Sequence, residues 1–159
     1  MFDKFGEFDS VEELNEAAAG QLEQGDMEAI YILAEENGIA KLDAEDYING
    51  DVPELASAML AAFGKLEVEA KELEIKGIME DWLAYIKQCC TNQDTARAVR
   101  KKGKSLKGCI AELLKWSFKN QVDIDKEILK ACGIGQKVTL GIPGMATAKK
   151  IITEYYLGK

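Results

Sequence analysis

Two short motifs in this sequence have residue types that chemistry uses. Gly-Lys-Ser at residues 103–105 matches the end of a phosphate-binding loop, in which backbone amides and a lysine hold a nucleotide. Cys89-Cys90 is a vicinal thiol pair, which can bind a soft metal ion or respond to oxidation. The complete phosphate motif needs a glycine where the chain has Ala98, and a strand where the pattern is helical. The thiols also fit a buried side chain beside a partly exposed one, so we expect no cofactor and no metal.

Catalytic arrangements are restricted because the chain contains no histidine. This excludes Ser-His-Asp and Cys-His nucleophiles within one chain, and every metal site that includes histidine. The four cysteines form no C-x-x-C pattern, and their spacing does not favour zinc. Paired carboxylates are numerous, but in so acidic a segment a solvated helix face explains them better than acid–base catalysis. We therefore expect a protein that is not an enzyme.

The charge of the chain is divided between its two halves. Residues 1–81 contain 22 acidic and 5 basic side chains, a net charge of −17, whereas residues 82–159 contain 6 and 15, a net charge of +9. Globular domains usually mix the two signs, because like charges repel. Segregation on this scale indicates either a charged partner or attraction between the two halves.

A dense basic run lies in the second half, with no acidic residue between Asp94 and Glu112. Such a density attracts nucleic-acid phosphates, and Lys149 and Lys150 are candidates for the same surface. The alternative is a solvated turn that pairs with the acidic half. The candidate nucleic-acid-binding residues are Arg97, Arg100, Lys101, Lys102, Lys104 and Lys107.

The acidic half has its own two interpretations. Rows of carboxylates on helices can imitate the phosphate spacing of a duplex and occupy a basic groove on another protein. The alternative is that acidic helices simply keep the protein in solution. The first candidates for a partner-binding surface are Glu35, Glu36, Asp43, Glu45 and Asp46.

The elements that position these residues are helices. The chain has two prolines, and apolar residues recur at helical spacing almost throughout, which predicts an all-α fold. We expect a compact bundle of about seven to eight helices in a single domain, residues 1–159, with a short extended segment near 137–142. No secretory signal and no run of about 18 apolar residues is present, so we expect a cytoplasmic protein without a membrane segment.

Particular residues predict where the helices begin and end. Ser10 and Glu13 form a capping box for the first helix. Pro53 is placed in the first turn of another. The apolar stripe from Lys65 to Cys90 predicts one long helix, in which Gly77 marks a close crossing or a bend.

Three parts of the chain carry a resemblance to a known family. They are Leu33-Ala34-Glu35-Glu36-Asn37-Gly38-Ile39 with Asp43-Ala44-Glu45-Asp46-Tyr47-Ile48; Lys104-Ser105-Leu106-Lys107-Gly108-Cys109-Ile110 with Leu113-Leu114-Lys115; and Val138-Thr139-Leu140-Gly141-Ile142-Pro143-Gly144 with Ala148-Lys149-Lys150-Ile151-Ile152. Together they resemble the PcfK-like family, small proteins encoded on conjugative plasmids and integrative elements. Some of its relatives are anti-CRISPR proteins that inhibit the type II RNA-guided DNA nuclease.

The resemblance implies a mobile-element protein and transfers no catalytic residue. The expected function is stoichiometric inhibition of a type II CRISPR nuclease, whose channels for guide and target are positively charged. The alternative is a nucleic-acid-binding accessory protein in plasmid conjugation or maintenance, which would contact DNA or RNA through the basic run. Self-association of the acidic half of one copy with the basic half of another is a further expectation.

Overall fold

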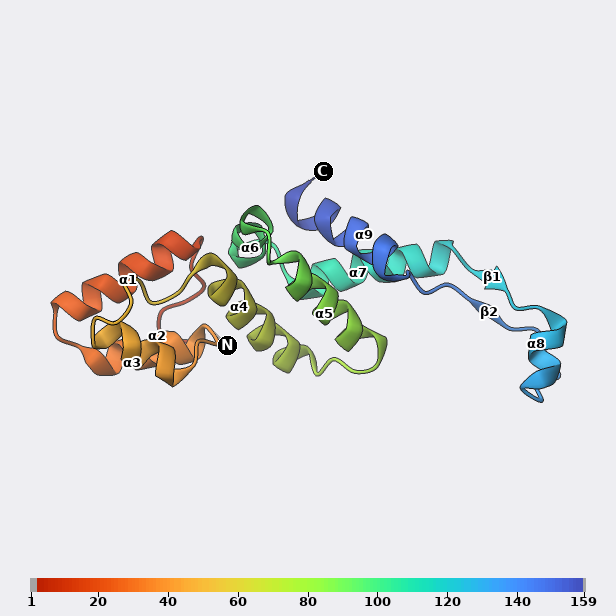
Figure 1. The fold of residues 1–159 in the computed structure, drawn as a ribbon, viewed down its shortest axis with the longest axis horizontal. Coiled ribbons are helices and arrows are strands. Elements are labelled where there is room, and N and C mark those ends of the chain that lie inside the picture. The colour runs from red at the N-terminus through yellow and green to blue at the C-terminus, as the bar shows by residue number, and fades with distance from the viewer. Residues whose placement is uncertain (1–2, 159) are drawn as a thin grey trace.

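The computed structural model describes residues 3–158, and this part of the chain is almost entirely helical (Figure 1). Within it, nine helices and one two-stranded sheet follow one another along the sequence. The helices are α1 (Val11–Glu23), α2 (Met27–Glu36), α3 (Lys41–Ile48), α4 (Ala58–Leu73), α5 (Ile78–Cys89), α6 (Gln93–Arg100), α7 (Leu106–Lys119), α8 (Lys126–Ala131) and α9 (Met145–Leu157); the strands are β1 (Val122–Asp123) and β2 (Thr139–Leu140). The predicted all-α class is confirmed.

The start of the first helix is as predicted. The Ser10 side chain accepts a hydrogen bond from the Glu13 amide at 3.1 Å, and α1 follows directly. The Glu13 carboxylate turns back and accepts from the amide of Asp9, one residue before the position that a standard capping box uses. The first contact satisfies an amide of the first turn, which has no partner within the helix, and the second holds the residue before the N-cap.

The long helix predicted from Lys65 to Cys90 is wrong, because the structure contains two helices there. α4 ends at Leu73, Glu74 takes a left-handed backbone conformation with φ of 49°, and α5 begins only after Gly77. Gly77 has φ of 64°, which glycine adopts without a steric penalty. The glycine therefore separates two helices, and the first of them, α4, continues without a break through residue 65, where the long helix was predicted to begin.

The prediction that Pro53 lies in the first turn of a helix is also wrong. Residues 49–57 connect α3 to α4 without regular structure, and α4 begins after Ser57. The Ser57 hydroxyl accepts from the Leu60 amide at 3.1 Å, so serine caps this helix.

The molecule is elongated, with three parts along its long axis (Figure 1). Helices α1, α2 and α3 form one end. The central part is α4 with α5, α6 and α7, and α9 packs on α5, α6 and α7. The buried apolar side chains of all these helices form one connected core, which contains the fully buried Trp82.

The first end is fixed to the centre by a close contact between two glycines. A Cβ atom on Gly38, just after α2, would lie 2.2 Å from the carbonyl oxygen of Gly64 in α4. A Cβ on Gly64 would lie 2.1 Å from the carbonyl oxygen of Asn37. Only the absence of both side chains allows the two backbones to approach this closely.

The third part is an arm, residues 120–144, which projects from the centre (Figure 1). It consists of β1, α8 and β2, and the strands pair antiparallel with Val122 opposite Leu140. The extended segment predicted near 137–142 is confirmed, and its partner is residues 122–123. At the base of the arm, a Cβ on Gly141 would lie 2.4 Å from the Ser117 carbonyl oxygen, so β2 passes close to the end of α7.

None of the helices in the described residues combines the length and the apolar character needed to cross a membrane.

Candidate partner-binding surfaces

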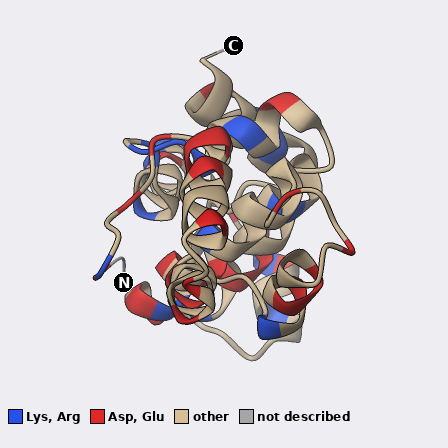
Figure 2. Ribbon diagram, turned by 90° about the vertical axis from the view of Figure 1, so that its left-hand side faces the viewer, with Lys and Arg blue, Asp and Glu red and all other residues tan. Residues whose placement is uncertain are grey.

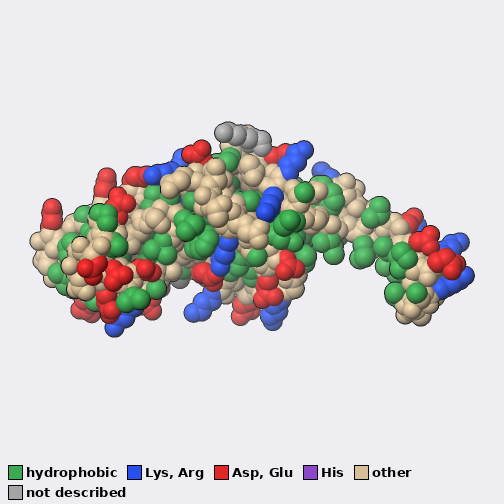
Figure 3. Space-filling view, in the orientation of Figure 1, with side chains coloured by type: hydrophobic (Ala, Val, Ile, Leu, Met, Phe, Trp, Pro, Cys, Tyr) green, Lys and Arg blue, Asp and Glu red, His purple; other side chains and the backbone are tan. Residues whose placement is uncertain are grey.

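The first end of the molecule is strongly acidic, and we call residues 10–57 the acidic lobe. It contains 13 acidic side chains and one basic side chain, Lys41, a net charge of −12. Seen end-on, its ribbon carries many acidic positions (Figure 2), and carboxylates gather on the corresponding end of the surface (Figure 3). Its exposed acidic residues are Glu12, Glu13, Glu16, Glu23, Asp26, Glu28, Glu35, Asp51 and Glu54. The lobe can therefore present negative charge to another macromolecule.

The predicted acidic residues do not form one cluster. Glu35, exposed on the last turn of α2, borders a hollow with Val68 and Lys71 of α4. Asp43 and Asp46 of α3 are half-buried and border a different hollow, beside the loop before α4. The acidic lobe thus offers two separate carboxylate groups.

The other two predicted residues are engaged by the chain itself. Both carboxylate oxygens of Glu36 accept backbone hydrogen bonds, one from the amide of Lys4 and one from that of Phe5 at 3.1 Å. Glu45 lies 3.9 Å from the ammonium group of Lys41, one turn earlier on the exposed face of α3. Glu36 therefore holds the N-terminal segment, and Glu45 is partly neutralised.

Residues 3–9 form a strap that runs from the acidic lobe to the basic run. Glu36 holds its beginning, and the Glu7 carboxylate lies 3.0 Å from the ammonium group of Lys65. The carbonyl oxygen of Phe8 accepts from the Arg100 guanidinium at 3.1 Å. The strap thus joins elements that lie far apart in the sequence.

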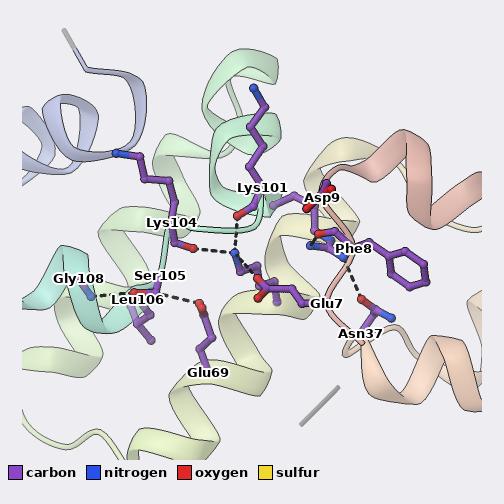
Figure 4. Close-up of polar contacts among 12 residues, drawn as sticks. Glu7, Phe8, Asp9, Asn37, Glu69, Lys101, Lys104, Ser105, Leu106 and Gly108 are labelled. Atoms are coloured by element: carbon purple, nitrogen blue, oxygen red, sulfur yellow. Dashed lines mark hydrogen bonds and ion pairs between the residues drawn. The ribbon is translucent and has the colours of Figure 1, made fainter. Parts of the chain in front are cut away.

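Lys65 is the centre of this polar cluster, and only 1% of its surface is exposed. Its partners Glu7, Lys101 and Lys104 are labelled in Figure 4. Its ammonium group donates to the carbonyl oxygens of Lys101 at 2.6 Å and Lys104 at 2.7 Å, in addition to the ion pair with Glu7. Three acceptors match the three N–H bonds of an ammonium group, which is what a buried charge requires. Lys65 therefore fixes the backbone of the basic run from the interior of the protein.

Arg100 is fully buried, although it belongs to the predicted basic surface. Its second terminal nitrogen donates to the side-chain oxygen of Asn37 at 3.1 Å, while Nε has no partner among the described residues. Burial lowers the pKa of Arg100, and the nearby carboxylates of Glu7, Glu13 and Glu69 act in the opposite direction. Arg100 is thus inside the protein and does not contribute to an exposed basic surface.

Two other residues of the basic run also have partners. Arg97 forms an ion pair with Glu12 of α1. The Lys104 ammonium group donates to the Tyr155 carbonyl oxygen at 2.8 Å and lies 4.8 Å from the centre of the Tyr155 ring. These contacts support the interpretation that part of the run pairs with the chain itself.

Three residues of the basic run remain exposed: Lys101, Lys102 and Lys107. They surround the turn between α6 and α7. Of the two candidates on α9, Lys150 is exposed and Lys149 is half-buried. The exposed basic surface is therefore smaller than the sequence predicts.

Glu69 of α4 stands beside this cluster and accepts from the Leu106 amide at the start of α7, at 3.2 Å (Figure 4). Burial raises the pKa of this carboxyl group, and the Lys65 charge partly opposes the shift. Its position at a helix N-terminus favours the ionised form as well. The carboxyl group thus helps to position α7.

The cysteines are reduced, and two of them are buried. Burial raises the pKa of Cys90 to about 12 and that of Cys109 to about 12. Cys89 is half-buried, and burial raises its pKa as well. No group of three or more His, Cys, Asp or Glu side chains within residues 3–158 is placed to hold a metal ion.

The sequence interpretation did not identify Lys65, Asn37 or the strap as structural. One signal was present: Lys65 lies three and four residues after Ala62 and Ala61, on the apolar face of its helix. A lysine on a buried face requires acceptors from elsewhere in the chain. Nothing in the local pattern shows that the carbonyl groups of residues 101 and 104 supply them.

Comparisons of this chain with family models, with curated proteins and with solved structures give no match.

Proposed function

We propose that this protein is a stoichiometric inhibitor that binds a type II CRISPR RNA-guided DNA nuclease, encoded by a conjugative mobile element. The observation that carries the proposal is the acidic lobe, with a net charge of −12 at one end of an elongated molecule. The nuclease holds its guide and target in positively charged channels and uses arginines to recognise the short motif beside the target. An acidic helical surface competes with nucleic acid for such positively charged channels.

Exposure of the carboxylates supports this proposal. Arg97 pairs with Glu12, and Lys87 of α5 pairs with Glu67 of α4, so the two halves are partly neutralised where they meet. Most acidic residues of the lobe are nevertheless exposed to solvent. Complementary charge of this kind accelerates encounter with a basic partner and discriminates against acidic ones.

The test is a DNA-cleavage assay with several type II nucleases and rising concentrations of the protein. We expect cleavage to stop near an equimolar ratio of inhibitor to nuclease. Undiminished cleavage at a large molar excess with every enzyme would remove the proposal. A pull-down with and without guide RNA then shows which form of the nuclease is bound.

Charge-neutral variants test whether the lobe is the docking surface. The triple variant Glu35→Gln, Asp43→Asn, Asp46→Asn keeps Glu36, which holds the strap, and should weaken inhibition at least about tenfold. The matched control is Glu112→Gln, Glu127→Gln, Glu154→Gln, which removes three charges outside the lobe. Equal inhibition by the two triple variants would argue against the acidic lobe as the docking surface.

A second candidate function is that of a nucleic-acid-binding accessory protein in conjugation or plasmid maintenance. The exposed lysines 101, 102 and 107 around one turn favour it. Binding to DNA or RNA should weaken steeply with salt and be lost when these three residues are replaced by Gln. Arg100 is left intact in this test because it is buried. Absence of a gel shift at low salt would contradict this function.

A further inference from the structure

Large apolar side chains are exposed along the arm and at its base. Phe118, at the end of α7 where the arm begins, has 78% of its surface exposed. The others in this region are Val122, Ile128, Ile134, Leu140, Ile142 and Met145. Hydrophobic side chains are visible along the projecting arm in the space-filling view (Figure 3).

The two strands of the arm have one apolar face and one polar face. Val122 and Leu140 are directly opposite in the antiparallel pair, so their side chains lie on the same face, where they are 64% and 50% exposed. Asp123 and Thr139 are opposite each other on the other face. There the Asp123 carboxylate lies 3.4 Å from the Lys137 ammonium group, and Thr139 donates to the Gln121 side chain at 3.1 Å.

This arrangement is incomplete as a folded unit. A two-stranded ribbon is marginally stable in water unless further strands or a helix pack on its apolar face. The polar face has its own contacts, whereas Val122 and Leu140 remain exposed in the described chain. The apolar face is therefore open to a partner that is itself apolar.

We propose that the apolar face of the arm is the interface of a symmetric homodimer, in which the arm of a second copy packs against it. A second arm offers the same apolar face, so a two-fold axis brings Val122 and Leu140 of both copies together. Two-fold dimers with self-complementary interfaces are the commonest homo-oligomers.

The distribution of charge selects a second copy as the occupant. The arm contains three acidic and three basic residues, a net charge of zero, so two arms approach without net repulsion. The acidic lobe lies at the opposite end of the molecule (Figure 1). Contact through the arms therefore keeps the two negative lobes apart, whereas a two-fold contact of one lobe with the other brings like charges together. A strongly charged partner gains no attraction from a neutral arm.

The first test is the mass in solution, measured by light scattering across a range of concentrations. We expect twice the chain mass of 17.5 kDa. The double variant Val122→Lys, Leu140→Lys should raise the dissociation constant at least about 100-fold and give a monomer. The matched control Gln121→Lys, Thr139→Lys adds the same charge to the polar face of the same strands and should remain a dimer.

A second test leaves the strands unchanged, in case the lysines disrupt the ribbon. Cys132 is exposed at the end of α8, so separate samples of wild-type protein can be labelled there with a donor or an acceptor dye. Energy transfer after mixing is expected, because the proposed interface brings the two arms together. A monomer at concentrations up to about 100 µM, a dimer without energy transfer, or a dimer unaffected by the Val122→Lys, Leu140→Lys variant would each overturn the proposal.

Discussion

Arg100 and Asn37 are 63 positions apart in the sequence, yet the Arg100 guanidinium group donates to the Asn37 amide oxygen at 3.1 Å. This contact joins the end of α6 to the residue that follows α2, and so connects the basic run to the acidic lobe. Because both side chains are buried, the contact belongs to the interior of the protein. The most conspicuous charge pattern in the sequence therefore includes a structural arginine.

Replacing Arg100 with Met should destabilise the protein by about 3 kcal/mol, because the Phe8 carbonyl and the Asn37 amide lose a charged donor. Urea unfolding followed by circular dichroism measures the effect. The exposed neighbour Lys102 is the control, and Lys102→Met should change the free energy of unfolding by no more than about 0.5 kcal/mol. Similar effects of both substitutions would show that the buried contacts contribute little.

Gly38→Ala should destabilise the protein by at least about 3 kcal/mol, because the new Cβ meets the Gly64 backbone and the residue has φ of 66°. Gly25→Ala is a matched control: its φ is 72°, but a Cβ there would meet no atom within 4 Å. The control should cost about 1 kcal/mol from backbone strain alone. Thermal or urea unfolding of both variants separates the steric clash from the backbone strain. An equal loss of stability in the two variants would contradict the close contact.

The free energy of unfolding of the Glu69→Gln variant should increase relative to that of the wild type as the pH rises. Burial raises the pKa of Glu69 above its usual 4.5, so the folded state binds this proton more tightly than the unfolded state does. The stability contributed by the protonated group is present below the unfolded pKa and is lost as the pH rises through the folded pKa. Glutamine does not ionise and avoids that loss.

The measurement for Glu69 is the free energy of unfolding of both proteins between about pH 4 and pH 7. The variant should gain relative to wild type across that interval. Glu16→Gln removes one negative charge from the exposed side of α1 and serves as the control. A relative gain in the opposite direction would mean that the contacts of Glu69 with Lys65 and Leu106 outweigh its burial.

The four thiols should react with a disulfide reagent at very different rates. Cys132 is exposed and should react first, whereas the raised pKa of Cys90 and Cys109, about 12 against an ordinary 9.0, leaves about a thousandfold less thiolate. Counting the protein thiols that react with the reagent before and after unfolding checks this. Cys132→Ser should remove the fast phase, and rapid reaction of Cys90 or Cys109 in the folded protein would contradict their burial.

Much of the helical framework could be predicted from local signals. Ser10, Asp26 and Ser105 are all capping side chains in the structure, because each can accept from an amide of the first turn. The boundary at Gly77 was missed because the apolar stripe continues across it. A glycine within an amphipathic pattern is compatible with a bend or a break, and packing of α5 on α9 decides between them.

The interior polar contacts could not be predicted, because they depend on the tertiary arrangement. Sequence places Arg100 among exposed lysines, and its burial depends on the Phe8 carbonyl and Asn37 arriving from distant segments. The pairing of residues 122–123 with 139–140 is similarly non-local, since α8 intervenes. Of the predicted acidic residues, sequence could not separate Glu35, which is exposed, from Glu36, which holds the strap.

The strap has a consequence for folding during synthesis, because one of its contacts forms only after a distant residue has been made. Phe8 is synthesised well before Arg100, to which it binds, because the two residues are 92 positions apart in the sequence. At usual rates of translation this is a delay of about 5 to 20 seconds. During that interval the acidic helices exist without the contact that fastens them to the rest of the fold, so they are accessible to chaperones and proteases.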